Sequence, residues 1–368
     1  MANLRANSIT GIGSTDAGIV FDGVTKINTQ NYFYLPTGNT GSRSAGIATD
    51  AGVMRFNSDS QKLEYYDGAQ WLQVSTFSPN LNGGARGIFA GGYISNVIDY
   101  ITITTTGNAI DFGDLLYNAP ICKSLSSSTR GIWAGARAAI NTINYVTISS
   151  TGNAQDFGDL LVGREDPSGA SNGTRGIFGG GSQVPIAGDE NTIEYITIAS
   201  TGNSVDFGDL TVARRHHGSC SSSTRGVFGG GFTPPTLLNT IDYITIATLG
   251  NAQDFGDLPF ISYGLSGCSN STRGLFSLGI VVPAASNILN YITIATTGNS
   301  QDFGDLTRGA YASGATSSPT RGVFGGTYPS SNVIDYVTIS TQSNAVDFGD
   351  LTVGRGHFDA CSNAHGGL

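Results

Sequence analysis

Hydrophobic residues occur along most of the chain in short runs bounded by Gly, Asn and Ser. Typical runs are RGVFGGG (225–231) and IDYITIA (241–247). Val, Ile, Thr, Tyr and Phe favour strands, and Gly-Gly and Gly-Asn pairs favour turns. Because no stretch of helical length shows a 3.6-residue apolar period, the pattern predicts an all-β protein.

Three sequence columns repeat six times with a period of 44 to 50 residues. The string Asp-Phe-Gly-Asp-Leu begins at Asp111, Asp156, Asp206, Asp254, Asp302 and Asp347. An Arg-Gly pair followed by an aliphatic and an aromatic residue begins at Arg86, Arg130, Arg175, Arg225, Arg273 and Arg321. The third column is Tyr100, Tyr145, Tyr195, Tyr243, Tyr291 and Tyr336.

The spacing between these columns is informative. The Tyr and the first Asp are always 11 residues apart, and the second Asp and the next Arg are always 16 apart. Fixed intervals are expected of paired strands, because a one-residue slip turns every side chain to the wrong face. From Arg to Tyr the distance varies from 14 to 20 residues, so this connection is expected at the surface.

Each repeat is therefore predicted to contain four strands. In one repeat these are 216–223, 225–231, 241–247 and a fourth strand that runs through the turn region LGNAQDF (249–255). Six such units are typical of a β-propeller with one sheet per blade. A β-solenoid is the weaker alternative, because its coils are shorter, at roughly 20 to 30 residues.

The end of the chain bears on ring closure. The last residues, CSNAHGGL (361–368), align with CSNSTRGL (268–275), so that Gly366 stands in the place of the repeated Arg. The first repeat, at Arg86, has no strand-one segment upstream. We therefore predict that about 352–365 supplies the missing strand and closes six blades over 85–368.

A different pattern precedes the repeats. The string MRFNSDSQKLEYYDG (54–68) predicts a β-hairpin, with apolar residues on either side of a polar turn. We expect residues 1–74 to form a small β module and 75–84 to form a linker. Such a module buries little surface alone and would need neighbours, such as copies of itself.

Composition excludes several classes of protein. The formal charge is −9 with three lysines, which argues against binding to a nucleic-acid backbone. No run of 18 apolar residues and no secretory signal is present, so we expect no membrane insertion and no export by that route. Cys220, Cys268 and Cys361 occupy one repeat position, which is typical of small buried side chains rather than disulfides. The four histidines show no metal-ligand spacing, and we expect no cofactor.

The paired aspartates of each repeat have two possible roles. They could bind calcium, but calcium needs more oxygen ligands than two carboxylates. We favour a structural role, in which one Asp caps the turn and the other pairs with an Arg of the Arg-Gly column. A kinase-type DFG site is excluded because the other kinase motifs are absent.

Residues that escape the repeat are the better binding candidates, because repeat identity marks packing. They fall in the connection between strands two and three and in the approach to strand one, where aromatic, Arg and His residues suit contacts with sugars or proteins. The first connection contains Tyr93, Arg137, Gln183 to Glu190, Phe232 to Leu238, Val281 to Ser286, and Tyr328. The second contains Tyr117, Arg164, Glu165, Arg215, His216, Tyr263, Arg308, Tyr311, His357 and Phe358.

Nothing in the sequence converges on a catalytic centre. His216 and His217 adjoin Arg214 and Arg215, but no nucleophile and base recur in step with them. We therefore expect no catalytic residues and no enzyme activity. Hydrolysis of a polysaccharide stays open as an alternative, because two carboxylates suffice for it.

Two resemblances add to this picture. VARRHHGSCSSSTRGVFGGG (212–231) with NTIDYITI (239–246) resembles the kelch repeat at Gly229, Gly230 and Tyr243, although Phe255 stands near the place of the kelch tryptophan. YITIATTGNSQDFGDL (291–306) resembles repeats of marine bacteriophage virion proteins, and GVMRFNSDSQKLEYYDGAQW (52–71) is similar to a β module of phage tail fibres. These resemblances imply a virion protein, assembled in the bacterial cytoplasm, whose N-terminal module binds other virion proteins and forms homo-oligomers, with trimers suspected.

The expected function is thus a non-enzymatic fibre or appendage component that binds a host-surface glycan or protein. The alternatives are a passive capsid or tail decoration protein and a depolymerase.

Overall fold

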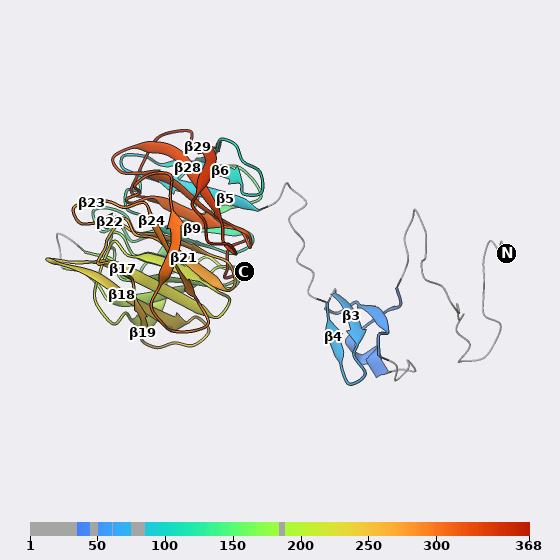
Figure 1. Ribbon diagram of the computed structural model, residues 1–368. Coiled ribbons are helices and arrows are strands. Elements are labelled where there is room, and N and C mark those ends of the chain that lie inside the picture. Colours follow the sequence, from blue (N-terminus) through green and yellow to red (C-terminus); the bar gives the residue numbers. More distant parts are fainter. Residues whose placement is uncertain (1–34, 45–50, 61, 75–84, 184–187) are drawn as a thin grey trace, which may run out of the picture. The chain divides into compact units, whose positions relative to one another are not determined.

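The computed structural model describes residues 35–44, 51–60, 62–74, 85–183 and 188–368. The chain separates into two compact units, Met1–Ser78 and Pro79–Leu368 (Figure 1). The expected linker, 75–84, lies outside the described residues. Apart from one short 3-10 helix, η1 (Thr40–Ser44), the regular elements of the described residues are strands, so the chain is all-β as predicted.

The second unit contains six antiparallel sheets of four strands each. The first sheet combines the end of the chain with its first repeat: β30 (Phe358–Ser362), β5 (Arg86–Gly91), β6 (Val97–Thr102) and β7 (Ile110–Asp114). The second and third are β8 (Lys123–Ser126), β9 (Arg130–Ala134), β10 (Thr142–Thr147), β11 (Gln155–Asp159), and β12 (Ser168–Ser171), β13 (Arg175–Gly179), β14 (Thr192–Thr197), β15 (Val205–Asp209). The fourth is β16 (Gly218–Ser221), β17 (Arg225–Thr233), β18 (Thr236–Thr245) and β19 (Gln253–Asp257).

The last two sheets follow the same order. They are β20 (Ser266–Ser269), β21 (Arg273–Ser277), β24 (Ile288–Thr293), β25 (Gln301–Asp305), and β26 (Gly314–Ser317), β27 (Arg321–Thr327), β28 (Ser331–Thr338), β29 (Val346–Asp350). A two-stranded hairpin, β22 (Ile280–Val281) with β23 (Ala284–Ala285), extends the fifth. The prediction of four strands per repeat is confirmed.

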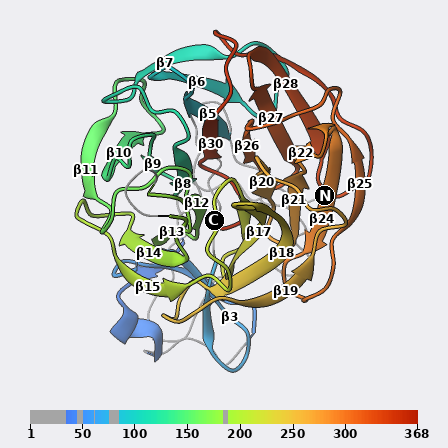
Figure 2. The same ribbon diagram turned by 90° about the vertical axis from the view of Figure 1, so that its left-hand side faces the viewer.

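The sheets lie around a common centre (Figure 2). The first strand of each sheet lies beside the first strands of two other sheets, in the order β30, β8, β12, β16, β20, β26 and again β30. Apolar side chains fill the spaces between neighbouring sheets. Phe228 and Ile244 of the fourth sheet, for example, pack against Ile177 and Phe207 of the third. This arrangement is β-propeller-like.

The glycine of the Asp-Phe-Gly-Asp string is required by contact between sheets. Gly158 has a φ of +146°, and a Cβ there would lie 2.4 Å from the carbonyl oxygen of Gly202 in the next sheet. The N–H of Gly202 donates to the carbonyl of Phe157 at 2.7 Å. Any side chain would push these two backbones apart, which explains why the position is Gly in every repeat.

The first unit contains one small sheet with the order β1 (Thr37–Gly38), β2 (Met54–Asn57), β3 (Lys62–Tyr66) and β4 (Trp71–Gln73). Strands β2 and β3 pair antiparallel, with Met54 opposite Tyr65 and Phe56 opposite Leu63. The predicted hairpin is confirmed. Its neighbour β4 extends the sheet by pairing with β3.

Candidate binding face

Antiparallel connectivity places the loops of residues 85–368 on two faces. The connections from first to second strand and from third to fourth strand lie at one end of each sheet, which we call the turn face. The connections from second to third strand, and from the fourth strand to the next first strand, lie at the other end, which we call the loop face. Isolated β-bridges join the two kinds of connection on the loop face: Glu165 with Ser182, Arg215 with Phe232, and Tyr263 with Ile280. Both sets of sequence-derived binding candidates therefore lie on one face.

Six residues around the centre of the loop face have left-handed backbone conformations. They stand just before the first strand of each sheet, and their φ values lie between 52° and 71°: Ile121, Asp166, His216, Gly264, Ala312 and His357. Five N–H groups of this set donate to the carbonyl of the preceding member, at 2.7 to 3.0 Å for Ile121, Asp166, Gly264, Ala312 and His357.

A positive φ is rare for a residue with a side chain and is a clear outlier for β-branched Ile121. Such strain persists only where surrounding contacts fix it, and it tends to cluster at functional sites. The backbone bonds between sheets provide that fixation, so the centre of the loop face is a rigid support for the side chains around it.

The structure brings seven sequence-derived candidates into one cluster, which we call the aromatic cluster: Arg215, His216, Phe232, Tyr263, Tyr311, Tyr328 and His357. The ring centroids of Phe232 and Tyr263 lie 5.8 Å apart, and those of Tyr263 and Tyr311 lie 5.6 Å apart. Tyr311 continues to His357 at 5.4 Å, and His357 to Tyr328 at 4.9 Å. These are the separations of favourable edge-to-face pairs. The cluster is a continuous set of rings contributed by different sheets.

Charged groups lie beside the rings. The guanidinium of Arg215 lies 5.7 Å from the centroid of Phe232 and within 3.6 Å of carboxylate oxygens of Glu165 and Asp189. His216 contacts Asp166, whose other oxygen lies 3.4 Å from the ammonium of Lys123. The carboxylates of Glu165 and Asp189 thus hold Arg215 in one orientation over the Phe232 ring.

The pKa values of these groups reflect burial and pairing. Burial alone would raise the pKa of Asp166, but His216 and Lys123 outweigh it and hold the pKa below its usual range. Burial acts to lower the pKa of Lys123, but Asp166 and Asp359 raise it above its usual value. Burial lowers the pKa of His357 to about 4. At neutral pH, Asp166 and Lys123 are charged and His357 is neutral.

Several candidates lie elsewhere. Phe358 is 1 % exposed and packs against Phe89, so its assignment to the binding surface is wrong. Tyr93 and Arg137 are exposed on the loop face. The side chain of Gln183 donates to Glu190, and the rest of that expected segment, 184–187, lies outside the described residues.

Arg164, Arg308 and Tyr117 have internal roles that the sequence interpretation missed. They contact a buried polar column one residue before the repeated Tyr: Asp99, Asn144, Glu194, Asp242, Asn290 and Asp335. Each acid of this column pairs with an arginine from the connection that leads into its own sheet: Asp99 with Arg355, Glu194 with Arg164, Asp242 with Arg214, and Asp335 with Arg308. In the second sheet the amide of Asn144 donates to the hydroxyl of Tyr117 at 3.1 Å.

The two Asn residues of the column stand where no arginine reaches. In the fifth sheet the position equivalent to Arg214 is Ser262, and the column residue is Asn290. Because an unpaired buried charge is costly, acid and arginine are kept or lost together. Comparing this column across the repeats could have revealed the pairing from the sequence.

The repeated arginines do not pair with the repeated aspartates, and this expectation is wrong. Each Nη1 donates at 2.7 to 3.0 Å to a carbonyl in the next sheet, that of Ile148, Ile198, Ile246, Ile294, Ile339 or Ile103. Each guanidinium also lies 4.4 to 4.9 Å from the ring centroid of the repeated Tyr of its own sheet. The guanidinium of each repeated Arg therefore contacts a Tyr ring and a backbone carbonyl instead of a carboxylate.

The expected cap on the turn is also different. The N–H of Asp114 donates to the side-chain oxygen of Asn153 in the next sheet at 3.1 Å, and in the same way an Asn of each third-to-fourth connection accepts from the end of the preceding sheet's fourth strand. The first Asp of each string is exposed. The cap is thus an Asn from the neighbouring repeat.

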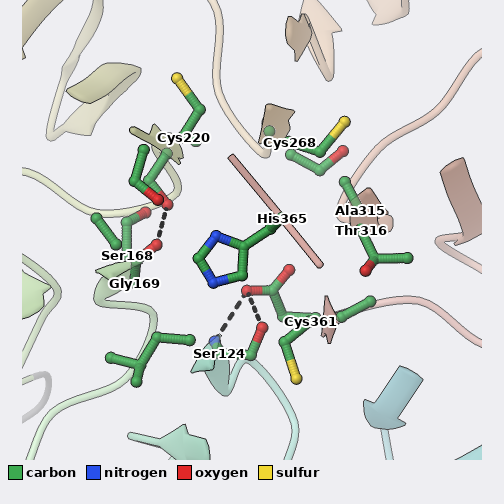
Figure 3. Close-up of a pocket in the computed structure, with 18 of the residues that line it drawn as sticks. Ser124, Ser168, Gly169, Cys220, Cys268, Ala315, Thr316, Cys361 and His365 are labelled. Carbon is green, nitrogen blue, oxygen red and sulfur yellow. Dashed lines mark hydrogen bonds between the residues drawn. The ribbon is translucent and has the colours of Figure 1, made fainter. Parts of the chain in front are cut away.

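A polar cavity of about 60 Å³ lies among the first strands (Figure 3). Its lining includes Lys123, His217 and Asp359 and many serine hydroxyls. A polar cavity of this size is large enough to hold water. The two imidazole nitrogens of buried His217 have no protein partner, which fits contact with such waters.

The end of the chain closes this cavity on the turn face. Nε2 of His365 lies 3.1 Å from the carbonyl of Ser126 and donates to it, and Nδ1 accepts the N–H of Gly367 at 3.0 Å. The N–H of Gly366 donates to the carbonyl of Ser269 at 2.9 Å. A Cβ at Gly366 would lie 2.1 Å from the carbonyl oxygen of Asn270, so the tail fits only because this position is Gly.

Comparison with known proteins informs the fold alone. The solved structure titled "Structure of YjhT" is similar to this chain with a TM-score of 0.55 and 9 % sequence identity, over 66 % of this chain and 87 % of that chain. No protein-family model and no curated protein matches the sequence.

Two further findings concern the described residues. None of their helices is long and apolar enough to cross a membrane. They also contain no group of three or more His, Cys, Asp or Glu side chains that could hold a metal ion. All four cysteines are buried, as the sequence predicted for three of them.

Proposed function

We propose that residues 85–368 are a six-bladed, kelch-like β-propeller closed by β30, and that the loop face binds a host-surface glycan or protein. In this proposal the protein is a non-enzymatic component of a phage fibre or appendage, without a cofactor. The N-terminal module attaches it to other virion proteins.

Contacts between the last and first repeats support the closed ring. Strand β30 pairs with β5 over five residues, from Phe358 opposite Gly91 to Ser362 opposite Gly87. The guanidinium of Arg321 reaches the carbonyl of Ile103 at 2.9 Å, and the N–H of Gly107 donates to the carbonyl of Phe348 at 2.8 Å.

The aromatic cluster is the observation that carries the binding proposal. Aromatic rings held on a rigid support can stack on sugars or anchor a protein partner, because they lose little freedom on binding. Large exposed apolar side chains also gather on the loop face: Tyr93, Ile94, Leu116, Leu161, Val162, Phe260, Ile261, Val282, Tyr328 and Val353. Single contacts would be weak, and several copies on one particle would multiply them by avidity.

The virion assignment rests on the sequence resemblances at 52–71 and 291–306. A virion reconstruction that locates this chain tests it directly. Finding the chain in no part of the particle would refute it.

Glycan-array binding by the full chain tests the ligand class. We expect Tyr263→Ala and Tyr328→Ala to weaken binding about 10- to 100-fold each, as for residues at the centre of an interface. Val346→Ala is the matched control, because this apolar side chain is exposed away from the loop face. Equal binding by all three variants would remove the aromatic cluster from the proposal.

A second candidate is a decoration protein whose loop face packs on virion partners. The aliphatic side chains outside the aromatic cluster favour it, since Leu116, Leu161 and Val353 are exposed and suit a protein interface better than a sugar. A virion map in which these side chains are covered would support decoration over host binding. Cleavage of a polysaccharide by the purified chain would instead favour the depolymerase alternative.

A further inference from the structure

One charged side chain in the loop-face connections is exposed, that of Arg137 between β9 and β10. The other charged side chains that the structure describes in these connections are buried or half-buried and have partners within the protein. Four arginines pair with the acids of the buried polar column, and Lys123 and Arg215 pair with nearby carboxylates. Glu190 accepts a hydrogen bond from Gln183.

Arg137 is also the single exposed cation of the second unit, as far as residues 85–183 and 188–368 show. The exposed carboxylates of these residues are the first Asp of each Asp-Phe-Gly-Asp-Leu string. The repeated arginines are half-buried and contact a Tyr ring and a carbonyl. The guanidinium of Arg137 makes no ion pair, hydrogen bond or ring contact with the described part of the chain, so it is free to bind a group from outside.

The turn that carries Arg137 is strained and fixed. The two residues that follow it, Ala138 and Ala139, have left-handed backbones with φ values of 70° and 54°. The N–H of Ile140 donates to the carbonyl of Ala136 at 3.3 Å and closes the turn. Such conformations are rare for residues with a side chain, and they persist only where the surrounding structure imposes them. The backbone of Arg137 is therefore held in one place.

Backbone hydrogen bonds connect this turn to the aromatic cluster. The N–H of Arg137 donates to the carbonyl of Pro120 at 3.1 Å. The next residue, Ile121, donates its own N–H to the carbonyl of His357 at 2.7 Å. Burial lowers the pKa of His357 to about 4, and the positive charge of Arg137 acts in the same direction. Arg137 therefore lies close enough to the cluster for one ligand to contact both.

We propose that the ligand of the loop face is an acidic glycan, and that Arg137 binds its carboxylate or phosphate group while the aromatic cluster contacts its sugar rings. This inference rests on the proposed function and specifies the class of ligand. A guanidinium binds either anion through two parallel N–H donors, which gives both charge and direction. Aromatic rings supply the apolar contact for a sugar ring.

The charge of the whole protein favours binding at this place. The formal charge of the chain is −9, and the exposed carboxylates of the second unit repel an anionic ligand. The carboxylates beside the aromatic cluster are neutralised by Lys123 and Arg215 and are largely buried, with at most 13 % of the side chain exposed for Glu165, Asp166 and Asp189. Electrostatic complementarity of this kind selects one orientation and excludes wrong partners.

A glycan array probed with the full chain tests the proposal. The array pairs each neutral oligosaccharide with its carboxylated and its phosphorylated counterpart, so the two arms distinguish the two anions. We expect the wild type to bind acidic members about 10-fold more tightly than their neutral counterparts, as for a hydrogen bond to a charged group. Raising the ionic strength to about 1 M should reduce this preference, because the screening length falls to roughly 3 Å.

Two substitutions of the same residue sharpen the result. Arg137→Gln should abolish the preference for acidic members and leave binding to neutral members unchanged. Arg137→Lys should keep part of the preference, because an ammonium retains the charge and loses the paired donors. Thermal melting of Arg137→Gln should match the wild type, since the guanidinium has no partner among the described residues.

Two controls match these variants. Lys62→Gln removes the same charge from an exposed position of the N-terminal unit and should keep the preference. Tyr263→Ala should weaken the binding of acidic and neutral members alike.

The outcomes separate the inference from the proposed function. Equal binding of acidic and neutral members by the wild type, or a preference that survives in Arg137→Gln, overturns the inference and leaves the proposed function standing. Binding to no member of the array overturns the inference together with glycan binding by the loop face.

Discussion

The two faces of the second unit differ in how far their residues repeat from sheet to sheet. On the turn face, the same contact recurs from sheet to sheet, since each repeated Arg reaches the next sheet's carbonyl and each Asn caps the preceding sheet. On the loop face, the equivalent positions hold Ile121, Asp166, His216, Gly264, Ala312 and His357, which share a backbone conformation and little chemistry. Because the turn-face contacts are made by residues that recur in every repeat, the side chains of the loop face are free to differ from repeat to repeat.

The difference teaches where specificity can reside in such a molecule. The turn face sets the spacing between sheets, so a change there disturbs packing. The loop face inherits a rigid support from those contacts, so a change there alters the surface presented to a partner. Substitutions on the two faces should therefore separate stability from binding, apart from the charge pairs buried beneath the loops.

The largest effect is expected from deleting residues 352–368, which removes a support shared by both faces. The variant loses β30, including fully buried Phe358, together with the tail that closes the cavity and the left-handed His357. We expect a loss of more than about 5 kcal/mol in the free energy of unfolding, comparable to the whole stability of a typical domain. Thermal melting measures it, and an unchanged melting temperature would contradict the closure of the ring by this strand.

Breaking one buried charge pair is expected to cost about 3–5 kcal/mol. Arg214→Ser leaves the carboxylate of Asp242 buried without its partner, which lies 3.0 Å away in the wild type. The double variant Arg214→Ser with Asp242→Asn reproduces the pair found in the fifth sheet, Ser262 and Asn290, and should recover most of the loss. Urea unfolding of both variants checks this, and a double variant less stable than Arg214→Ser would contradict the pairing rule.

Acid should weaken both faces through histidine. Burial lowers the pKa of His365 on the turn face and of His357 on the loop face to about 4. Between pH 6.5 and 4 the unfolded chain then binds more protons than the folded chain, so the free energy of unfolding falls as the pH falls. Relative to wild type, His365→Gln and His357→Gln should each reduce the loss between pH 7 and 4.5 by roughly 2 kcal/mol. Equal pH dependence of the variants and the wild type would show that neither histidine is responsible.

The smallest effect is expected from one cap on the turn face. Asn153→Ala removes the acceptor for the N–H of Asp114 and should cost about 1 kcal/mol. Asn153→Asp keeps an acceptor oxygen and should cost less. Ligand binding by the loop face should be the same in both variants, and a change in binding would break the separation of the two faces.

Much of the fold could be read from the repeats. The intervals of 11 and 16 residues located the paired strands because register is fixed wherever both faces of a strand are packed. The variable Arg-to-Tyr interval located a surface loop, because residues outside the strand pairs are not held to one register and tolerate insertions. Phe358 was misjudged because it stands outside the repeated columns, and the sequence alone does not show that the end of the chain is buried beside Phe89.

The partners of the repeated polar residues could not be read in this way. The columns of Arg and Asp recur in step, which suggested ion pairs, yet the guanidinium of each Arg reaches a carbonyl of the next sheet. Period and spacing report which residues are equivalent, and they do not report which equivalent residues meet across two sheets. The aromatic cluster could not be read from the spacing either, because Phe232, Tyr263 and Tyr311 come from different repeats.

By itself the sequence determined the all-β class and the four strands of each repeat, because local propensity and fixed spacing are written along one chain. Only the tertiary structure decided which side chains meet at the centre of the loop face and how the end of the chain closes the cavity. These outcomes depend on distances between segments far apart in sequence, and packing in three dimensions sets those distances.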